Sequence, residues 1–310
     1  MIRLIHDQSL PEHLRGSVIA LGNFDGFHLG HQAVVNRAIA LGFHERRPVI
    51  VATFDPHPVK FFKPDIPPFR LTTLDQRETL FAHAGADAML VFRFGKELAS
   101  MDAGDFVAEV LAKHLGSAAV VTGDDFSFGK GRTGDVRLLK KLGKAHGIVA
   151  EAVPQVLLDG VRISSGRIRE ALVEGDTGTA THMLSRNFAI EGIVQRGDAR
   201  GRQLGYPTAN LGLGDYQRPK YGIYAARVTL EDGSEHPGVA SLGVRPTFQP
   251  PQELLEAHLF GFDGDLYGKK IEVALHAFIR DEKKFEQVEA LVANMREDEA
   301  AARKLLALPE

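Results

Sequence analysis

The stretch SVIALGNFDGFHLGH, residues 17–31, joins an apolar run, a polar loop with three glycines, and the start of a helical pattern. Its first five residues are typical of a buried strand, and a helix is expected from Leu29 to Glu45. A strand, a glycine-containing loop and a helix in this order present backbone N–H groups and a positive helix end to a phosphate. The stretch therefore predicts an α/β domain with an anion site.

The same alternation of apolar runs and helical patterns continues through the first half of the chain. Strands are expected at residues 48–54, 88–94, 117–123 and 148–153, and helices at 74–84, 103–115 and 136–146. Apolar runs of this length separated by helices are typical of βαβ units and a parallel sheet. The loops that follow such strands usually carry the ligand site.

The second half changes character after about Ser185. Glycine-rich turns separate short segments in which apolar and polar residues alternate, as in residues 254–260 and 269–279. This pattern predicts an antiparallel barrel or sandwich. A terminal helix is expected to bury one apolar side, with the charged residues 296–298 largely in solvent. The apolar side is expected to consist of Phe285, Val288, Val292 and Met295.

Composition narrows the class of protein. The chain has 310 residues, 44% of them hydrophobic and 25% charged, which suits two folded domains. No run approaches the roughly 18 apolar residues of a membrane span, and the N-terminus lacks the pattern of a secretory signal. The absence of cysteine excludes disulfides and favours the cytoplasm. A net charge of −3 without a basic half makes a nucleic-acid partner unexpected, and the composition leaves a homo-oligomer open.

The stretch of residues 17–31 ends with two histidines, His28 and His31, whose imidazoles could bind a phosphate. Two imidazoles three residues apart at a helix start can face one phosphate and stabilise the charge that builds in its transition state. Exposed turn histidines and a metal-binding pair are alternatives, although no third metal ligand is evident. A dinucleotide site is a further alternative, with Asp55 as the ribose-binding acid, but the glycine spacing is wrong for it.

Two later segments of the first half also suit a nucleotide or a planar ligand. The loop GDDFSFG, residues 123–129, sets Phe126 and Phe128 beside Asp125. Rings next to polar groups suit a heteroaromatic ligand, whereas core phenylalanines under a polar loop are the alternative. ISSGRIREAL, residues 163–172, combines hydroxyls and guanidinium groups at a helix start, which forms a second anion site or a capped surface helix.

In the second half, Thr208 and Asn210 stand two apart at the start of a strand, and Glu256 lies within a strand. The hydroxyl and amide oxygens are hard ligands suited to Mg²⁺, which retains waters and nucleotide phosphates. Glu256, opposite in face to Leu255 and Ala257, could act as a general base for a hydroxyl. A structural turn and an outward-facing strand residue are the alternatives.

Together, these motifs resemble those of bacterial bifunctional riboflavin kinase/FAD synthetases. GNFDGFHLGH, TFDPHP, GDDFSFG and ISSGRIR resemble the FMN adenylyltransferase module, which implies a Rossmann-like nucleotidyltransferase fold over residues 1–184. GRQLGYPTAN, PKYGIYA, LGVRPTF, EAHLFGFDGDLYGK and FIRDEKKF resemble the riboflavin kinase module over residues 185–310. That module is a six-stranded Greek-key barrel with a terminal helix. The two resemblances cover nearly the whole chain.

The resemblance implies an adenylyltransferase site in the first module. His28 and His31 would stabilise the α-phosphate of ATP while the FMN phosphate attacks it, and FAD and pyrophosphate would be the products. Further ATP and phosphate contacts would come from Gly22, Asn23, Phe24, Gly30, Ser164, Ser165, Arg167 and Arg169. The flavin would contact Asp55, Asp125, Phe126 and Phe128.

The resemblance implies a kinase site in the second module, with riboflavin, FMN and ATP as the small-molecule substrates of the whole protein. Thr208 and Asn210 would hold Mg²⁺ against ATP, and Glu256 would accept the proton of the ribityl hydroxyl. The phosphates would be wrapped by Gly197, Gly201, Arg202 and Gly205, and Arg280 would contact the flavin.

Two positions depart from the family pattern. Gly166 stands where a hydroxyl residue is usual, and Ser241 stands where Asn is usual, so both put affinity in question more than activity. Two other functions are weighed: a nucleotidyltransferase with another acceptor, and a flavin carrier without catalysis. The second-half motifs argue against the first, and the presence of His28, His31 and Glu256 argues against the second.

Overall fold

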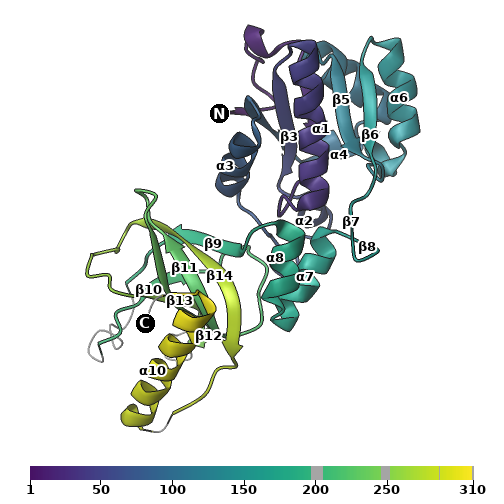
Figure 1. Cartoon of the computed structure of the whole chain (residues 1–310). Coiled ribbons are helices and arrows are strands. Elements are labelled where there is room, and N and C mark those ends of the chain that lie inside the picture. The colour runs from purple at the N-terminus through teal and green to yellow at the C-terminus, as the bar shows by residue number, and fades with distance from the viewer. Residues whose placement is uncertain (197–204, 246–251, 286, 309–310) are drawn as a thin grey trace. The chain divides into compact units, whose positions relative to one another are not determined.

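The computed structural model describes residues 1–196, 205–245, 252–285 and 287–308 (Figure 1). The chain divides into two compact units, one formed by Met1–Pro67 with Thr72–Ser164 and the other by Pro68–Leu71 with Ser165–Glu310. Each unit is built on one six-stranded sheet. In the described part of the chain, no helix has the length and apolar character required to cross a membrane.

The first unit contains a parallel sheet with strand order β1-β4-β3-β2-β5-β6. Its strands are β1 (Ile2–Ile5), β2 (Val18–Leu21), β3 (Val49–Asp55), β4 (Ala88–Arg93), β5 (Ala119–Gly123) and β6 (Val149–Val153). Its main helices are α1 (Leu29–Glu45), α3 (Leu74–Ala84), α5 (Ala103–Asp105), the π-helix η2 (Phe106–His114) and α6 (Val136–Ala145). Shorter elements are η1 (Glu12–Leu14), α2 (Pro58–Phe62), α4 (Lys96–Ser100), η3 (Lys130–Arg132) and the hairpin strands β7 (Leu157–Leu158) and β8 (Val161–Arg162).

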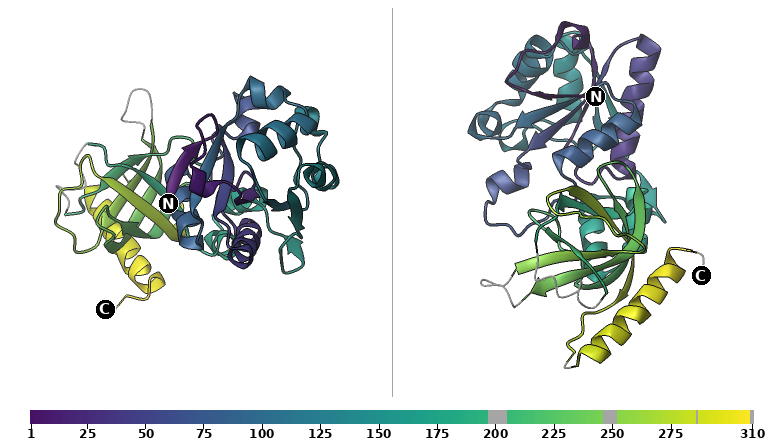
Figure 2. Two further views of the ribbon diagram at one scale, coloured as in Figure 1. Left: turned by 90° about the horizontal axis from the view of Figure 1, so that it is seen from above. Right: turned by 90° about the vertical axis from the view of Figure 1, so that its left-hand side faces the viewer.

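Helices cover both faces of this sheet, as the views in Figure 2 show. On one face, α1 and α3 pack their apolar side chains against alternate residues of the central strands. On the other face, η2 and α6 pack against the intervening residues. Because both faces of the sheet are buried, the central strands are continuous apolar runs in the sequence. For this reason the sequence predicts them well.

The sequence does not predict every element of this unit. The strand β1 is a four-residue sheet edge, too short to show a period, and the hairpin β7–β8 has two residues in each strand. The helix expected at residues 103–115 forms, but most of it is π-helical. Its Phe106, Val107 and Leu111 are buried in the core of the first unit.

The second unit begins with two helices and continues into an antiparallel sheet of order β10-β13-β12-β11-β14-β9. The helices are α7 (Ser165–Glu174) and α8 (Thr177–Leu184), and the strands are β9 (Phe188–Ile193), β10 (Ala209–Gly212), β11 (Gly222–Thr229), β12 (Glu235–Arg245), β13 (Gln252–Leu259) and β14 (Lys270–Arg280). An isolated bridge between Gln195 and Asn210 joins the two outer strands. The predicted six-stranded barrel with a terminal helix is confirmed.

The terminal helix α10 (Val288–Leu305) contains a buried charged residue that the sequence analysis places in solvent. The side chain of Asp298 is only 8% exposed and accepts two hydrogen bonds, each 2.7 Å long, from the guanidinium of Arg280 on β14. The expectation that residues 296–298 are largely solvated is therefore wrong for Asp298. Val288, expected on the buried side, is 55% exposed instead.

Replacing Asp298 with Ala should destabilise the protein by about 3 kcal/mol, because it leaves the half-buried Arg280 guanidinium without its bidentate partner. Urea unfolding followed by circular dichroism measures this loss. The matched control is Glu299→Ala on the same helix, which removes an i,i+4 pair with Arg303 and should cost only about 0.5 kcal/mol. Equal losses in the two variants would show that Arg280 does not anchor this helix.

Candidate active sites

The loop between β2 and α1, residues 22–28, is shaped by two buried phenylalanines. Phe24 and Phe27 have φ values of 49° and 42°, and they are 1% and 4% exposed. Both rings pack edge-on against Phe81 of α3, with centroid separations of 5.8 and 5.1 Å. A non-glycine residue at positive φ costs about 1–2 kcal/mol. Burying a phenylalanine ring contributes about 1.5–3 kcal/mol, so the packing offsets the backbone cost.

Two groups of buried hydrogen bonds support this loop from the protein interior. Asp25 accepts from the backbone N–H of Thr72 at 3.0 Å, while the Thr72 hydroxyl accepts from the Gly26 N–H at 2.9 Å. The carbonyl of Asn23 accepts from the Thr53 hydroxyl at 2.7 Å and from Arg77 Nη1 at 3.2 Å. The sequence analysis misses this support, because no local motif marks a contact between residues so far apart in the chain.

His28 and His31 stack on each other at the start of α1. Their ring centroids are 3.6 Å apart with an interplanar angle of 17°. His28 is the N-cap residue, and its Nδ1 accepts the His31 backbone N–H at 3.3 Å, which places the neutral ring's proton on Nε2. Gly30 permits this arrangement, since a Cβ there would lie 3.1 Å from His28 Cε1. Both imidazoles therefore lie at the start of α1, and their contact with a phosphate stays a prediction.

The segment ISSGRIR is divided between the two units. In the first unit, the Ile163 carbonyl lies 3.9 Å from the place of a Cβ on Gly30, so Ser164 follows directly beside the start of α1. In the second unit, Arg169 Nε donates to the Phe69 carbonyl at 2.7 Å, and its guanidinium lies over the Phe69 ring. The approach of Ser165, Arg167 and Arg169 to the histidines stays a prediction.

The residues predicted to contact a planar ligand differ in their surroundings. Phe128 is 8% exposed and packs on Phe106 within the core, and the half-buried Phe126 stacks on it at 5.7 Å. Asp125 is exposed and forms an ion pair with Arg162 of the hairpin. Asp55 is half-buried at the end of β3, where a cis peptide bond joins it to Pro56.

An exposed aromatic cluster beyond β3 and β4 is absent from the sequence analysis. Phe54, Phe61 and Phe62 each pack against Phe94, with centroid separations between 5.5 and 5.9 Å. Phe62 is 63% exposed. An exposed ring held by other rings offers a flat apolar surface at the carboxyl edge of the sheet, and the pair FF in TFDPHPVKFF is the signal that could have found it.

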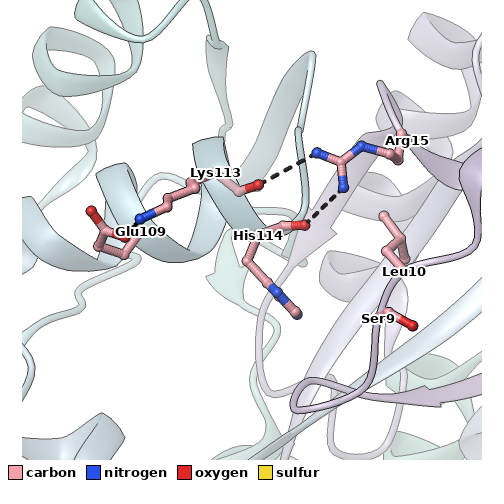
Figure 3. A pocket seen from close by; sticks show the side chains of 6 residues that line it. All are labelled: Ser9, Leu10, Arg15, Glu109, Lys113 and His114. Atoms are coloured by element: carbon pink, nitrogen blue, oxygen red, sulfur yellow. Dashed lines mark hydrogen bonds and ion pairs between the residues drawn. The ribbon is translucent and has the colours of Figure 1, made fainter.

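A cavity of about 540 Å³ in the first unit lies away from these motifs (Figure 3). It is lined by Ser9, Leu10, Arg15, Glu109, Lys113 and His114. The guanidinium of Arg15 donates to the carbonyls of Lys113 and His114 at 3.4 Å, at the C-terminal end of η2. Arg15 thus satisfies carbonyls at this helix end, and Lys113 is paired with Glu109 at 2.8 Å, so both cations of the lining already have partners.

In the second unit, strand register brings Asn210, Ser241 and Glu256 side by side. Glu256 of β13 lies opposite Asn210 of β10 and opposite Ser241 of β12. Residues that pair directly across neighbouring strands share one face of the sheet. Asn210 is 6% exposed, whereas Glu256 and Ser241 are half-buried. The prediction that Leu255 and Ala257 face the opposite, buried side is confirmed.

Thr208 precedes Asn210 and is held in place by its neighbours. His258 Nδ1 lies 2.9 Å from the Pro207 carbonyl, and its ring packs edge-on against Tyr206. These contacts fix the position of the segment that precedes β10, beside Glu256.

Of the predicted phosphate-binding residues, Gly205 has a φ of 83° and lies in the turn before this segment, while Gly197, Gly201 and Arg202 fall outside the described residues. The guanidinium of Arg280, predicted to contact flavin, binds Asp298.

Glu253, three residues before Glu256, binds the start of β13 to the loop between β10 and β11. Arg218 donates Nε and Nη2 to one carboxylate oxygen at 2.9 and 2.8 Å, and the Tyr221 hydroxyl donates to the other. The bond from Arg218 holds the pKa of Glu253 below its usual value. Burial, reinforced by the Glu253 carboxylate, raises the pKa of Tyr221 to about 12.

The contribution of Glu253 to stability should depend on pH. Since its folded-state pKa lies below the unfolded value of 4.5, the ionised carboxylate stabilises the fold above that pH, and the effect disappears as pH falls through the folded pKa. Glu253→Gln should therefore lower the melting temperature at about pH 7 but much less at about pH 3.5. The exposed Asp263→Asn is the control. A pH-independent deficit in Glu253→Gln would contradict the assignment.

Comparison with known proteins identifies the family of this chain. A family model for FAD synthetase matches residues 10–167, and a model for riboflavin kinase matches residues 184–306. The chain is 39% identical over 308 residues to the bifunctional riboflavin kinase/FMN adenylyltransferase of Escherichia coli K12, covering 99% of this chain and 98% of the relative. It belongs to this bifunctional family.

Other comparisons agree over the whole length of the chain. The corresponding enzyme of Pseudomonas fluorescens is 41% identical over 312 residues, covering 99% of this chain and 98% of the relative. A crystal structure of a Streptococcus pneumoniae protein described as a macrolide-efflux protein matches with a TM-score of 0.87 and 30% identity, covering 98% of this chain and 99% of the other. The protein is thus a bifunctional transferase that phosphorylates riboflavin and adenylylates FMN, with ATP as the phosphate and AMP donor.

Proposed function

We propose that adenylyl transfer occurs at the start of α1, with His28 and His31 at the α-phosphate of ATP. The observation that carries this assignment is the stacked pair of imidazoles at a helix N-terminus, where Nδ1 of His28 caps the helix and Nε2 carries the proton of the neutral ring. An oxygen of the FMN phosphate attacks the α-phosphorus, and the bond from that phosphorus to the α,β-bridging oxygen breaks, so that pyrophosphate leaves. The helix end and imidazoles stabilise the charge on the reacting phosphate.

The remaining groups of the first site hold the two substrates in place. Gly22, Asn23, Phe24 and Gly30 contact ATP, and Ser164, Ser165, Arg167 and Arg169 hold the departing pyrophosphate. The flavin lies at the carboxyl edge of the sheet near Asp55, Asp125, Phe126 and Phe128. The exposed ring of Phe62 at the same edge supports this placement, because a planar flavin can stack on it. FMN already carries an ionised phosphate, so no protein nucleophile is needed.

In the second unit, we place riboflavin phosphorylation at Glu256. Glu256 accepts the proton of the ribityl hydroxyl as that oxygen attacks the γ-phosphorus of ATP, and ADP leaves. Its position beside the buried Asn210 and the half-buried Ser241 supports this role, since these neighbours orient the carboxylate within a polar strip. Gly197, Gly201, Arg202 and Gly205 wrap the phosphates, and Arg280 contacts the flavin.

The donors in this strip fit Mg²⁺. Thr208 and Asn210 supply a hydroxyl and an amide oxygen, and no cluster of three or more His, Asp or Glu side chains suited to a metal occurs in the described ranges. Such a sparse donor set suits an ion that completes its shell with water and nucleotide phosphates. When bound, Mg²⁺ neutralises phosphate charge. Thr208 and Asn210 hold it, with the path of Thr208 set by the His258 contact to Pro207.

The boundary between the two modules lies at residue 184 in this proposal, with residues 1–184 serving adenylylation and 185–310 serving phosphorylation. The riboflavin kinase model begins at residue 184, which supports it. By its internal contacts, however, the second compact unit also includes α7 and α8. We place the enzyme in the cytoplasm, in keeping with the absence of cysteine.

Two conservative substitutions should separate the half-reactions. His28→Asn keeps an N-cap acceptor but removes the imidazole, so FAD formation from FMN should fall by about 100- to 1,000-fold while riboflavin phosphorylation persists. Glu256→Gln should lower FMN formation by about 100-fold or more and leave adenylylation of supplied FMN intact.

The assay incubates each purified variant with ATP, Mg²⁺ and either riboflavin or FMN, and separates the flavins by chromatography over time. Each variant serves as the control for the other, because each retains one activity. Loss of both activities in either folded variant would refute separate sites. Tight FMN binding by the unaltered protein without pyrophosphate release would support a carrier instead.

A further inference from the structure

A buried arginine lies directly beneath the loop that follows β2. Arg77 of α3 is only 3% exposed. Its Nη1 donates to the Thr53 hydroxyl at 2.8 Å and to the Asn23 carbonyl at 3.2 Å, and its Nε lies 3.3 Å from the Thr73 carbonyl. Placing a guanidinium in the interior is costly unless its hydrogen bonds are made. The contacts therefore tie the Asn23 carbonyl to a rigid helix.

The direction of that carbonyl sets the direction of the next backbone N–H. Thr53 is fully buried and also donates to the Asn23 carbonyl, so the carbonyl points into the protein. The C=O and N–H of a trans peptide point in opposite directions, hence the Phe24 N–H points away from the interior. Within the described ranges, this N–H donates no hydrogen bond to the protein. It remains free to donate to a phosphate oxygen.

The backbone at this point would not keep its shape without support. Phe24 and Phe27 both occupy the left-handed region, which is unfavourable for residues with a side chain. Phe81, four residues after Arg77 on the same helix, packs against both rings. One face of α3 thus supplies the apolar contact and the hydrogen bonds that hold the loop. His28 and His31 follow at the C-terminal end of the loop, where α1 begins.

We infer that Arg77 and Thr53 are positioning residues for FMN adenylylation, acting through the Asn23 carbonyl. They hold the Asn23–Phe24 peptide so that its N–H donates to an ATP phosphate as the reaction proceeds. This inference rests on the proposed placement of ATP at the loop. A preorganised donor acts mainly in the transition state, so its misplacement lowers kcat more than it raises the KM for FMN.

The sharpest test compares Thr53→Val with Thr53→Ser. The Val side chain keeps the shape of Thr but lacks the hydroxyl, whereas Ser retains it. Thr53→Val should lower kcat for adenylylation by about 100-fold with little change in the KM for FMN, and Thr53→Ser should restore most of the rate. Arg77→Met should behave like Thr53→Val, and Arg77→Lys should recover only part of the rate because a single ammonium cannot replace the fork of donors.

Riboflavin phosphorylation by the same chain is the internal control and should be unchanged in every variant. Thr73→Ala is the matched structural control, since it removes the hydroxyl that caps α3 but leaves the bonds to Asn23 in place. It should lower the melting temperature and spare kcat. Equal adenylylation rates for Thr53→Val and Thr53→Ser would overturn the inference, as would a Thr73→Ala variant with the same loss of kcat.

The outcome for His28→Asn separates this inference from the proposal on which it rests. If His28→Asn retains full adenylylation, ATP does not react at this loop and the placement of the site is wrong. If His28→Asn is inactive while Thr53→Val and Arg77→Met keep the full rate, the site is correct and the positioning role is refuted. Should Arg77→Met fail to fold, the two Thr53 variants still decide the question.

Discussion

The packing of Phe24 and Phe27 against Phe81 is the contact on which the loop of the proposed adenylyltransferase site depends. It allows two bulky residues to remain at positive φ, and it brings α3 under the loop between β2 and α1. The carboxyl end of β2 then meets the N-terminus of α1 at one place, where the buried His28 and the half-buried His31 stack on each other. An anion site of this kind needs no charged side chain of its own, because the helix N-terminus supplies a partial positive charge and free backbone N–H groups.

The proposed kinase site depends on strand register rather than on a loop. Asn210 and Glu256 are far apart in the chain, and only the pairing of β10 with β13 places them opposite each other. A shift of one residue would turn Glu256 toward the apolar interior and Ala257 outward. The contacts that prevent such a shift lie close by: the Arg218–Glu253–Tyr221 cluster holds the beginning of β13, and His258 holds the segment before β10.

Charged side chains serve different purposes in the two units. Asp298 shows that an acidic residue in a charged run is not always solvated, because Arg280 compensates for its burial. Arg77 is buried beneath the loop between β2 and α1 and donates hydrogen bonds to backbone and hydroxyl oxygens. In the sequence, Asp298 and Arg77 look alike, because each is one of several charged residues within a helix. Their environments differ because one helix packs on the barrel and the other on the parallel sheet.

The sequence by itself determined the alternation of buried strands and helices, the change to period-two strands after Ser185, and the pairing of His28 with His31. Each of these follows from local spacing, which the backbone converts directly into geometry. The short strand β1, the π-helical turn of η2 and the burial of Asp298 were decided only by tertiary packing. The same is true of the contact between Arg77, Thr53 and the Asn23 carbonyl. These features join residues remote in the chain, and hydrophobic periodicity carries no information about which remote side chains meet.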